Sequence, residues 1–253
     1  MLPSNATKTA AFTLIELLVV LAILGLLSTL MATSVMNALT QGKVTVSLSN
    51  LRQLGTAMIA YSTDHQGNLP PSMSSNNLVR WHGSRNSVSE AFGASGGYLS
   101  DYLGEDQRIK QCPLLGSKAI KSGSFELGAG GYGYNGSYLG GGFIEGKHHP
   151  VTISSIGNLH QVIAFATTAF ANKNGLQEYP FTDPYTAPSG GYALQPSTHF
   201  RANGKALICW ADGHVSKEKP NKEDGPNYYG GDNTVHEIGW FGPSTDNGYW
   251  NPR

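Results

Sequence analysis

The sequence has few cysteines, few charged residues and no excess of either charge sign. Its 253 residues include two cysteines, Cys112 and Cys209, and 13% charged residues, against a usual share of about 25%. Two thiols exclude a disulfide-rich scaffold and a zinc site built from four thiolates. The formal net charge of zero argues against a nucleic-acid binder, because such proteins neutralise phosphates with basic side chains.

The two cysteines leave one structural choice open. If the part of the chain that holds them is exported, Cys112 and Cys209 can form a disulfide, because oxidising compartments allow it. The alternative is a pair of buried free thiols, which pack as small apolar side chains. Both alternatives fit the sequence.

Recognisable catalytic motifs are also scarce. No serine or cysteine stands in a nucleophile elbow, and Cys209 lies inside an apolar strand pattern suited to packing. Gly128, Gly130 and Gly133 match the dinucleotide-binding spacing, but no apolar strand precedes them and no helix pattern follows. We therefore predict no enzyme and no catalytic residue.

The longest apolar run of the chain lies near its start, from Phe12 to Met36. This run contains no proline and one ionisable residue, Glu16. Its roughly 25 residues would form a helix of about 37 Å, enough to cross a hydrocarbon core of about 30 Å. A carboxylate near the start of such a helix is costly in lipid, so Glu16 is a candidate functional residue.

The residues before the run indicate its orientation. Residues 1–11 contain Lys8 and no acidic residue. Because positive residues stay on the cytoplasmic side, the start of the chain is predicted to be cytoplasmic and the rest extracytoplasmic.

Beyond Met36 the helical pattern becomes amphipathic. Apolar or small residues recur at spacings of three and four, with polar residues, Ser47 among them, in between: Val44, Leu48, Leu51, Gly55 and Met58. The helix is predicted to end between Asp64 and Gly67, before Pro70.

The remaining chain reads as loops and short strands. We expect short helices at 87–92 and 98–103, and a Gly/Tyr-rich loop or edge strand within 125–143. Residues 161–169 are apolar enough to form a central strand. The last strand is predicted within 235–241.

Two turn signals follow one another near the carboxyl terminus. Asn203-Gly204 is the strongest hairpin signal, because both residues tolerate positive φ, and it lies between strand patterns at 198–201 and 205–211. Asp212-Gly213 marks a second turn before residues 214–217. Together they predict a three-strand antiparallel meander.

The start of the chain resembles a known signal. Lys8, the small residues before Phe12, the order Phe-Thr-Leu-Ile-Glu and the apolar run that follows resemble the class III signal of type IV prepilins and type II secretion pseudopilins. In that family a prepilin peptidase cleaves before the phenylalanine and methylates its new amino group. The resemblance implies cleavage between Ala11 and Phe12, although Ala11 stands where glycine is usual.

The resemblance also implies an α+β, pilin-like fold. Residues 1–11 would be the leader, 12–65 a spine helix with 12–36 in the inner membrane, and 66–253 an extracytoplasmic domain in which the helix packs on an antiparallel sheet. It implies assembly with other pilin or pseudopilin subunits in a pilus or secretion filament. There Glu16 would pair with the amino group of Phe12 on a neighbouring subunit.

Two other functions remain open. The first is a minor pilin whose loops contact a surface, a polysaccharide or a secreted substrate through a group of tyrosines: Tyr132, Tyr134, Tyr138 and Tyr185. The second is a membrane-tethered metal-binding or hydrolytic domain that uses His199, Asp212 and His214.

The carboxy-terminal candidates depart from the pattern that they resemble. Residues 206–215 resemble a motif of an environmental-bacterial branch of pilin-like proteins, in which a histidine precedes Asp-Gly by ten positions. Here Ala202 takes that position, and the nearest upstream histidine is His199. We therefore expect Asp212 to make a turn, with His199 and His214 at a wet sheet edge.

No cofactor is expected. Several acidic residues are dispersed in the late loops and could supply oxygen ligands to Ca²⁺, but their spacing matches no defined calcium loop: Asp183, Glu223, Asp224, Asp232 and Asp246.

Overall fold

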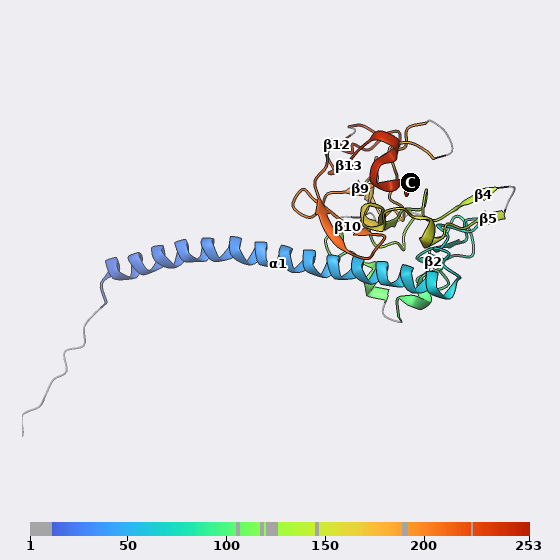
Figure 1. Ribbon diagram of the computed structural model, residues 1–253. Helices are drawn as coiled ribbons and strands as arrows, with labels where there is room; N and C mark the ends of the chain where they lie inside the picture. Colours follow the sequence, from blue (N-terminus) through green and yellow to red (C-terminus); the bar gives the residue numbers. More distant parts are fainter. Residues whose placement is uncertain are drawn as a thin grey trace, which may run out of the picture. The chain divides into compact units, whose positions relative to one another are not determined.

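The protein combines one long helix with a globular part made of short strands (Figure 1). The structure is a computed structural model that describes residues 12–104, 107–116, 119, 126–144, 147–188, 192–223 and 225–253. The predicted leader, residues 1–11, lies outside the described residues. The α+β class expected from the sequence is confirmed.

Helix α1 (Leu14–Asp64) is shared by two compact units. The first unit ends at Gly42 and the second runs from Lys43 to Arg253. The second half of α1 therefore belongs to the globular unit. The helix ends at the predicted position, before the breakers that precede Pro70.

The strands of the described part are short. They are β1 (Val79–Arg80), β2 (Gly83–Ser84), β3 (Tyr132–Tyr134), β4 (Gly142–Ile144), β5 (Lys147–His149), β6 (Ile163–Thr167), β7 (Phe170–Asn172), β8 (Gly175–Gln177), β9 (Thr198–His199), β10 (Ala206–Trp210), β11 (Val215–Glu218), β12 (Lys222–Glu223) and β13 (Ile238–Trp240). Short 3-10 helices lie between them: η1 (Ser100–Tyr102), η2 (Gln107–Lys110), η4 (Ile153–Ser155), η5 (Leu159–Gln161) and η6 (Thr245–Trp250).

The main sheet has the antiparallel order β11-β10-β6-β3. Strand β6 lies inside this sheet and is buried over its whole length, so the predicted central strand is confirmed. Strand β3, from the Gly/Tyr-rich segment, lies at the edge, as expected. The sheet thus explains why β6 and β10 are apolar on both faces.

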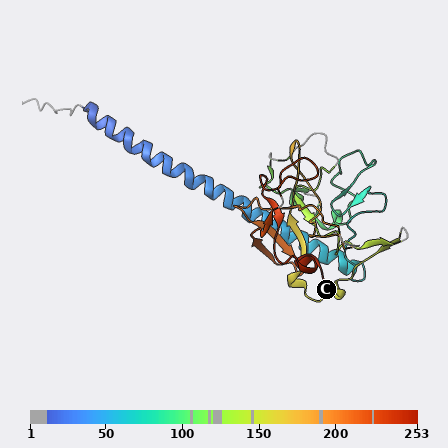
Figure 2. The same cartoon turned by 90° about the horizontal axis from the view of Figure 1, so that it is seen from above.

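Alternate residues of β10 face two different cores. Leu207 and Cys209 join the cluster that contains Leu51 and Met58 of α1, whereas Ile208 and Trp210 join a cluster with Trp240 and Trp250. Figure 2 shows the second half of α1 running alongside the strands of this unit. One face of the sheet therefore packs on the helix and the other on the late loops.

The amphipathic face of α1 is the predicted one. Val44, Leu51, Gly55 and Met58 are buried, and Leu48 is partly buried. Ser47, which was placed among the polar positions, is also buried, and its hydroxyl oxygen lies 3.6 Å from the Cys112 sulfur. The Ser47 hydroxyl can be buried on this face because the Cys112 sulfur is its hydrogen-bond partner.

The predicted three-strand meander is wrong in its first strand. The Asn203-Gly204 turn has positive φ at both residues, 57° and 71°, and the Asp212-Gly213 turn joins β10 to β11. Strand β9, however, pairs with β13 in a separate sheet of order β12-β13-β9. Both edges of β10 are already occupied, by β6 and β11, so β9 cannot pair with it.

The local helix predictions are partly wrong. Residues 87–92 form turns and bends without a helix, and only Ser100–Tyr102 of the segment 98–103 is helical, as η1. The last strand lies within the predicted range, as β13. Side-chain contacts stabilise these short polar segments, and the helix propensity of a short stretch does not predict such contacts.

Candidate functional site

Thr13 and Glu16 cap the start of α1. The Glu16 amide donates to Thr13 Oγ1 at 3.2 Å, and Glu16 Oε2 accepts from the Thr13 amide at 2.9 Å and from its hydroxyl at 2.8 Å. This reciprocal pattern is a capping box, which satisfies amide groups that a helix start leaves without partners. The Thr-x-x-Glu spacing that signals it is present in the sequence, although we considered Glu16 only as a functional carboxylate.

The first half of α1 presents an apolar surface. The large apolar side chains that the structure describes from Phe12 to Leu39 are exposed, by fractions between 44% at Val20 and 80% at Leu14. Such a continuous apolar surface marks a membrane or protein contact, because it is unfavourable in water. Among the described residues, α1 is the one helix that is long and apolar enough to cross a membrane, with a mean hydropathy of 2.6 in its most apolar window.

Two hydroxyl groups in this half of α1 are satisfied within the helix. Ser28 donates to the Leu24 carbonyl at 2.7 Å, and Thr29 donates to the Leu26 carbonyl at 2.8 Å. Polar groups in lipid need such internal partners, since no water is there to replace them. These residues therefore do not oppose insertion.

The structure describes one of the two residues at the predicted cleavage position. Phe12 is 75% exposed and lies just before α1, whereas Ala11 lies outside the described residues. Cleavage between Ala11 and Phe12 therefore stays a prediction.

The structure does not bring the carboxy-terminal candidates together as one site. Asp212 lies in the β10–β11 turn, where its Oδ1 accepts from the amide and from the ring Nδ1 of His214, at 3.0 and 2.7 Å. The His214 ring is stacked on Trp210, with 5.6 Å between the ring centres. His199 is buried in β9, in another sheet, so the expected wet edge is wrong for this residue.

The Asp212 carboxyl has an ordinary turn environment. Partial burial acts to raise the pKa of Asp212, but the amide and ring of His214 outweigh it and lower this pKa. Within the described ranges, no three His, Cys, Asp or Glu side chains are close enough to share a metal ion. Asp224, one of the acidic residues considered for Ca²⁺, lies outside those ranges.

Both cysteines are free and buried. Cys112 lies against Ser47, and a methyl group at Gly55 would meet the Cys209 sulfur. These two helix positions are about 12 Å apart along α1, whereas disulfide-bonded residues have Cα separations of about 4.4–6.8 Å. The disulfide alternative is therefore not the one in the structure, and burial raises the pKa of Cys209 to about 12.

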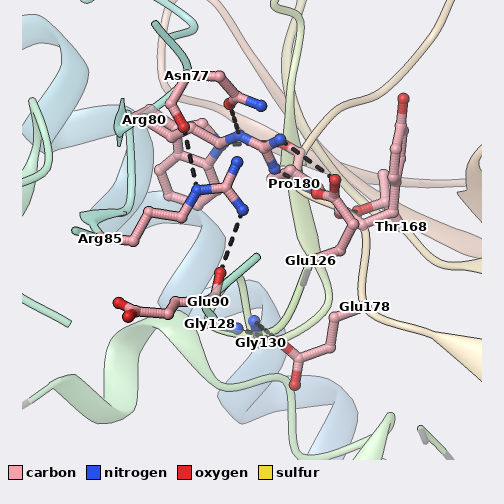
Figure 3. A network of polar contacts seen from close by, with 12 residues as sticks. Asn77, Arg80, Arg85, Glu90, Glu126, Gly128, Gly130, Thr168, Glu178 and Pro180 are labelled. Carbon is pink, nitrogen blue, oxygen red and sulfur yellow. Dashed lines mark hydrogen bonds and ion pairs between the residues drawn. The ribbon is translucent and has the colours of Figure 1, made fainter. Parts of the chain in front are cut away.

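A buried ion pair holds the polar segment that follows α1. Arg80 donates through Nη1 and Nη2 to the Glu126 carboxylate and through Nε to Asn77 Oδ1 (Figure 3). Two guanidinium groups lie over the Phe92 ring, that of Arg80 4.5 Å and that of Arg85 4.2 Å from the ring centre. These contacts replace the secondary structure that the segment lacks.

A second carboxylate in the same view holds the Gly-rich loop. Glu178 Oε2 accepts from the amides of Gly128 and Gly130, at 2.9 and 2.8 Å (Figure 3). Two of the three glycines of the formal dinucleotide match are thus bound by a side chain of the protein itself. These hydrogen bonds therefore stabilise the loop.

The tyrosines that we considered as surface contacts lie inside the protein. Tyr132 and Tyr134 are fully buried, Tyr185 is 8% exposed, and Tyr138 is partly buried. The expectation that these rings form a binding surface is therefore wrong.

Comparison with known proteins identifies one feature. A model described as the prokaryotic N-terminal methylation motif matches residues 7–32. This match supports the type IV pilin and pseudopilin family and a substrate of prepilin peptidase, and it points to a structural subunit without enzymatic activity. No curated protein matches the chain, and no solved structure matches it.

Proposed function

We propose that the chain is a structural subunit of a type IV pilus-like or type II secretion filament. The observation that carries this proposal is the start of α1, where one carboxylate, Glu16, follows Phe12 at the head of an exposed apolar helix. The methylation motif covers the same residues. The chain would enter the inner membrane as a single span, with its start in the cytoplasm and its globular unit outside.

Processing creates the second half of the assembly site. Cleavage before Phe12 by prepilin peptidase exposes a new α-amino group, which is a cation when protonated. In a filament core Glu16 would be buried, and a buried carboxylate stays ionised only with a partner. The amino group of Phe12 on a neighbouring subunit would be that partner, and it would set the axial register of the helices.

One carboxylate oxygen of Glu16 is available for this contact. Both capping hydrogen bonds from Thr13 use Oε2, so Oε1 can accept from the amino group. The contact joins two different surfaces of identical or related subunits. Such heterologous contacts build a helical filament when the rotation between subunits does not close into a ring.

Two substitutions separate the two roles of Glu16. Glu16→Gln keeps an oxygen that can accept from Thr13 but removes the negative charge. Thr13→Val removes the capping hydroxyl but keeps the charge. If the charge pair sets the register, Glu16→Gln gives an inserted, folded protein that forms no filaments, and Thr13→Val still assembles.

The measurement is the amount of this chain in sheared filaments, relative to the amount in the membrane. Normal filaments from Glu16→Gln, together with a defect in Thr13→Val, would reduce Glu16 to a helix cap. Mass spectrometry of the mature amino terminus tests the processing step. An N-methylated Phe12 is expected, whereas an intact Met1 would indicate a plain membrane anchor.

A further inference from the structure

A second surface feature of the globular unit is an aromatic cleft of about 370 Å³. Five aromatic rings line it: Phe170, Tyr179, Tyr192, Tyr228 and Tyr229. Its volume lies within the range of ligand pockets, about 300–1,000 Å³. None of these rings belongs to the group of tyrosines that the sequence suggested.

Four of the five rings come from three parts of the chain. Phe170 begins β7, Tyr179 follows β8, and Tyr228 and Tyr229 lie in the connection between β12 and β13. The Phe170 ring centre is 4.5 Å from that of Tyr229, edge to face, and 5.3 Å from that of Tyr179, and the ring centres of Tyr228 and Tyr229 are 5.6 Å apart. These four rings therefore form one continuous wall.

The exposed rings of this wall stand on a fixed turn. Tyr228 is 89% exposed and Tyr229 is 54% exposed. Asn227 Oδ1 accepts from the amides of Tyr229 and Gly231, at 3.0 and 3.1 Å, and its Nδ2 donates to the Ala171 carbonyl at 2.9 Å. Large apolar side chains held in solvent in this way commonly mark a binding site.

The described lining of the cleft carries a negative charge and contains no basic residue. Asp183 is the only charged residue of the lining within the described part of the chain. Burial raises the pKa of Asp183 to about 6, although the hydroxyls of Tyr179 and Ser197 hydrogen-bond to its carboxyl and act in the opposite direction. The Gln195 Oε1 atom is buried and has no hydrogen-bond partner.

We propose that this cleft binds an organic ammonium cation with N-methyl groups. The ring faces attract such a cation through their negative electrostatic potential. The Asp183 carboxylate, the one charged group of the described lining, supplies the counter-charge. A neutral sugar fits less well, because the one charged group of the described lining is a carboxylate, which favours a positive charge.

The test compares two molecules of the same shape. Choline and 3,3-dimethylbutan-1-ol differ in one atom, the charged nitrogen, which is a carbon in the alcohol. Isothermal titration of each into the full chain, in a polyoxyethylene detergent that contains neither sugar nor choline, measures the contribution of the charge. We expect choline to bind between about 2-fold and about 30-fold more tightly than the alcohol.

Three variants test the residues of the cleft. Asp183→Asn keeps the size and one acceptor oxygen but removes the charge, and it should abolish the preference for choline. Tyr228→Leu should weaken choline binding without loss of folding, because this ring is mostly exposed. Asp101→Asn removes an exposed carboxylate outside the cleft and should leave binding unchanged.

Each further result decides for or against the proposal. Glycerophosphocholine that binds more tightly than choline would identify a lipid head group as the source of the cation, and weaker binding would indicate a free amine. Equal binding of choline and its neutral isostere, or tighter binding of a methyl glycoside than of choline, would overturn the proposal. The Glu16→Gln chain should bind choline normally, so a failure of assembly does not affect this result.

Discussion

Replacing Gly55 by alanine tests how closely α1 packs on the sheet. In an exposed helix this change stabilises by about 1 kcal/mol, because alanine has the higher helix propensity. At Gly55 the added methyl group would lie 2.6 Å from the Cys209 sulfur and 3.3 Å from the Gly213 Cα. Both distances are shorter than a normal contact, so α1 or β10 must move.

The expected sign follows from the two opposing effects. Overpacking a filled core costs about 1–3 kcal/mol, which exceeds the gain in propensity. We therefore expect Gly55→Ala to lower the free energy of unfolding by up to about 2 kcal/mol. Gly42→Ala is the matched control, since nothing lies within 4 Å of a methyl group there, and it should be neutral or stabilising.

A double-mutant cycle assigns the cost to one contact. Cys209→Ala removes the sulfur atom that the new methyl group would meet, so the two substitutions together should be less harmful than the sum of their separate effects. We expect a coupling free energy of about 1–3 kcal/mol, as for residues in direct contact. Additive effects would mean that the Gly213 backbone, not the thiol, limits the space.

Urea unfolding of the full chain in detergent provides the measurement. Tryptophan fluorescence reports only on the globular unit, because all four tryptophans lie there: Trp81, Trp210, Trp240 and Trp250. An unchanged slope with a shifted midpoint shows a change in stability alone. If Gly55→Ala stabilised the protein as Gly42→Ala does, the close contact between α1 and β10 would be refuted.

Three further predictions concern buried polar groups, and urea unfolding at fixed pH tests each of them. Glu126→Gln leaves the buried Arg80 guanidinium without its counter-charge and should cost about 3–5 kcal/mol; the exposed Glu90→Gln is the control, and equal effects would contradict a buried pair. Burial raises the pKa of Asp183 to about 6 in the folded protein, so the protonated carboxyl stabilises the fold and this contribution is lost as pH rises from about 4 to about 6. Asp183→Asn should therefore stabilise the protein by about 1–3 kcal/mol at pH 7. No gain at pH 7 would argue against a desolvated carboxylate. Thr167→Val removes a buried hydroxyl that accepts from a β10 amide and donates to a β9 carbonyl, both at 3.0 Å, and should cost about 1–3 kcal/mol; a cost near zero would show that neither group depends on it.

The parts of the fold that depend on local pattern could be predicted from the sequence. The apolar run after Phe12 and the spacing of Leu51 and Met58 gave the helix and its buried face, because one helical period repeats over many residues. Asn203-Gly204 gave its turn, because few residue pairs accept positive φ twice. Each of these signals lies within a short stretch of chain.

Contacts between distant segments could not be predicted in the same way. The partner of β9 is β13, about forty residues later, and nothing in Thr198–His199 names it. Arg80 and Glu126 are also far apart in sequence, and each alone resembles an ordinary surface charge. The burial of the tyrosines could not be predicted either. Tyr132 and Tyr228 both have glycines or aromatic residues as sequence neighbours, but Tyr132 is buried and Tyr228 is exposed.

The capping box refines the role of Glu16 in the proposed assembly. A carboxylate near the head of a membrane helix is costly, but Thr13 already supplies two hydrogen bonds to Oε2 in the single chain. The subunit therefore has part of the carboxylate satisfied before any partner arrives, and the helix start, with its positive end, favours a negative charge there. The neighbouring amino group then competes only for Oε1, so its contribution lies in matching the charge and fixing the register. The comparison of Glu16→Gln with Thr13→Val separates these contributions, because one variant changes the charge and the other changes the cap.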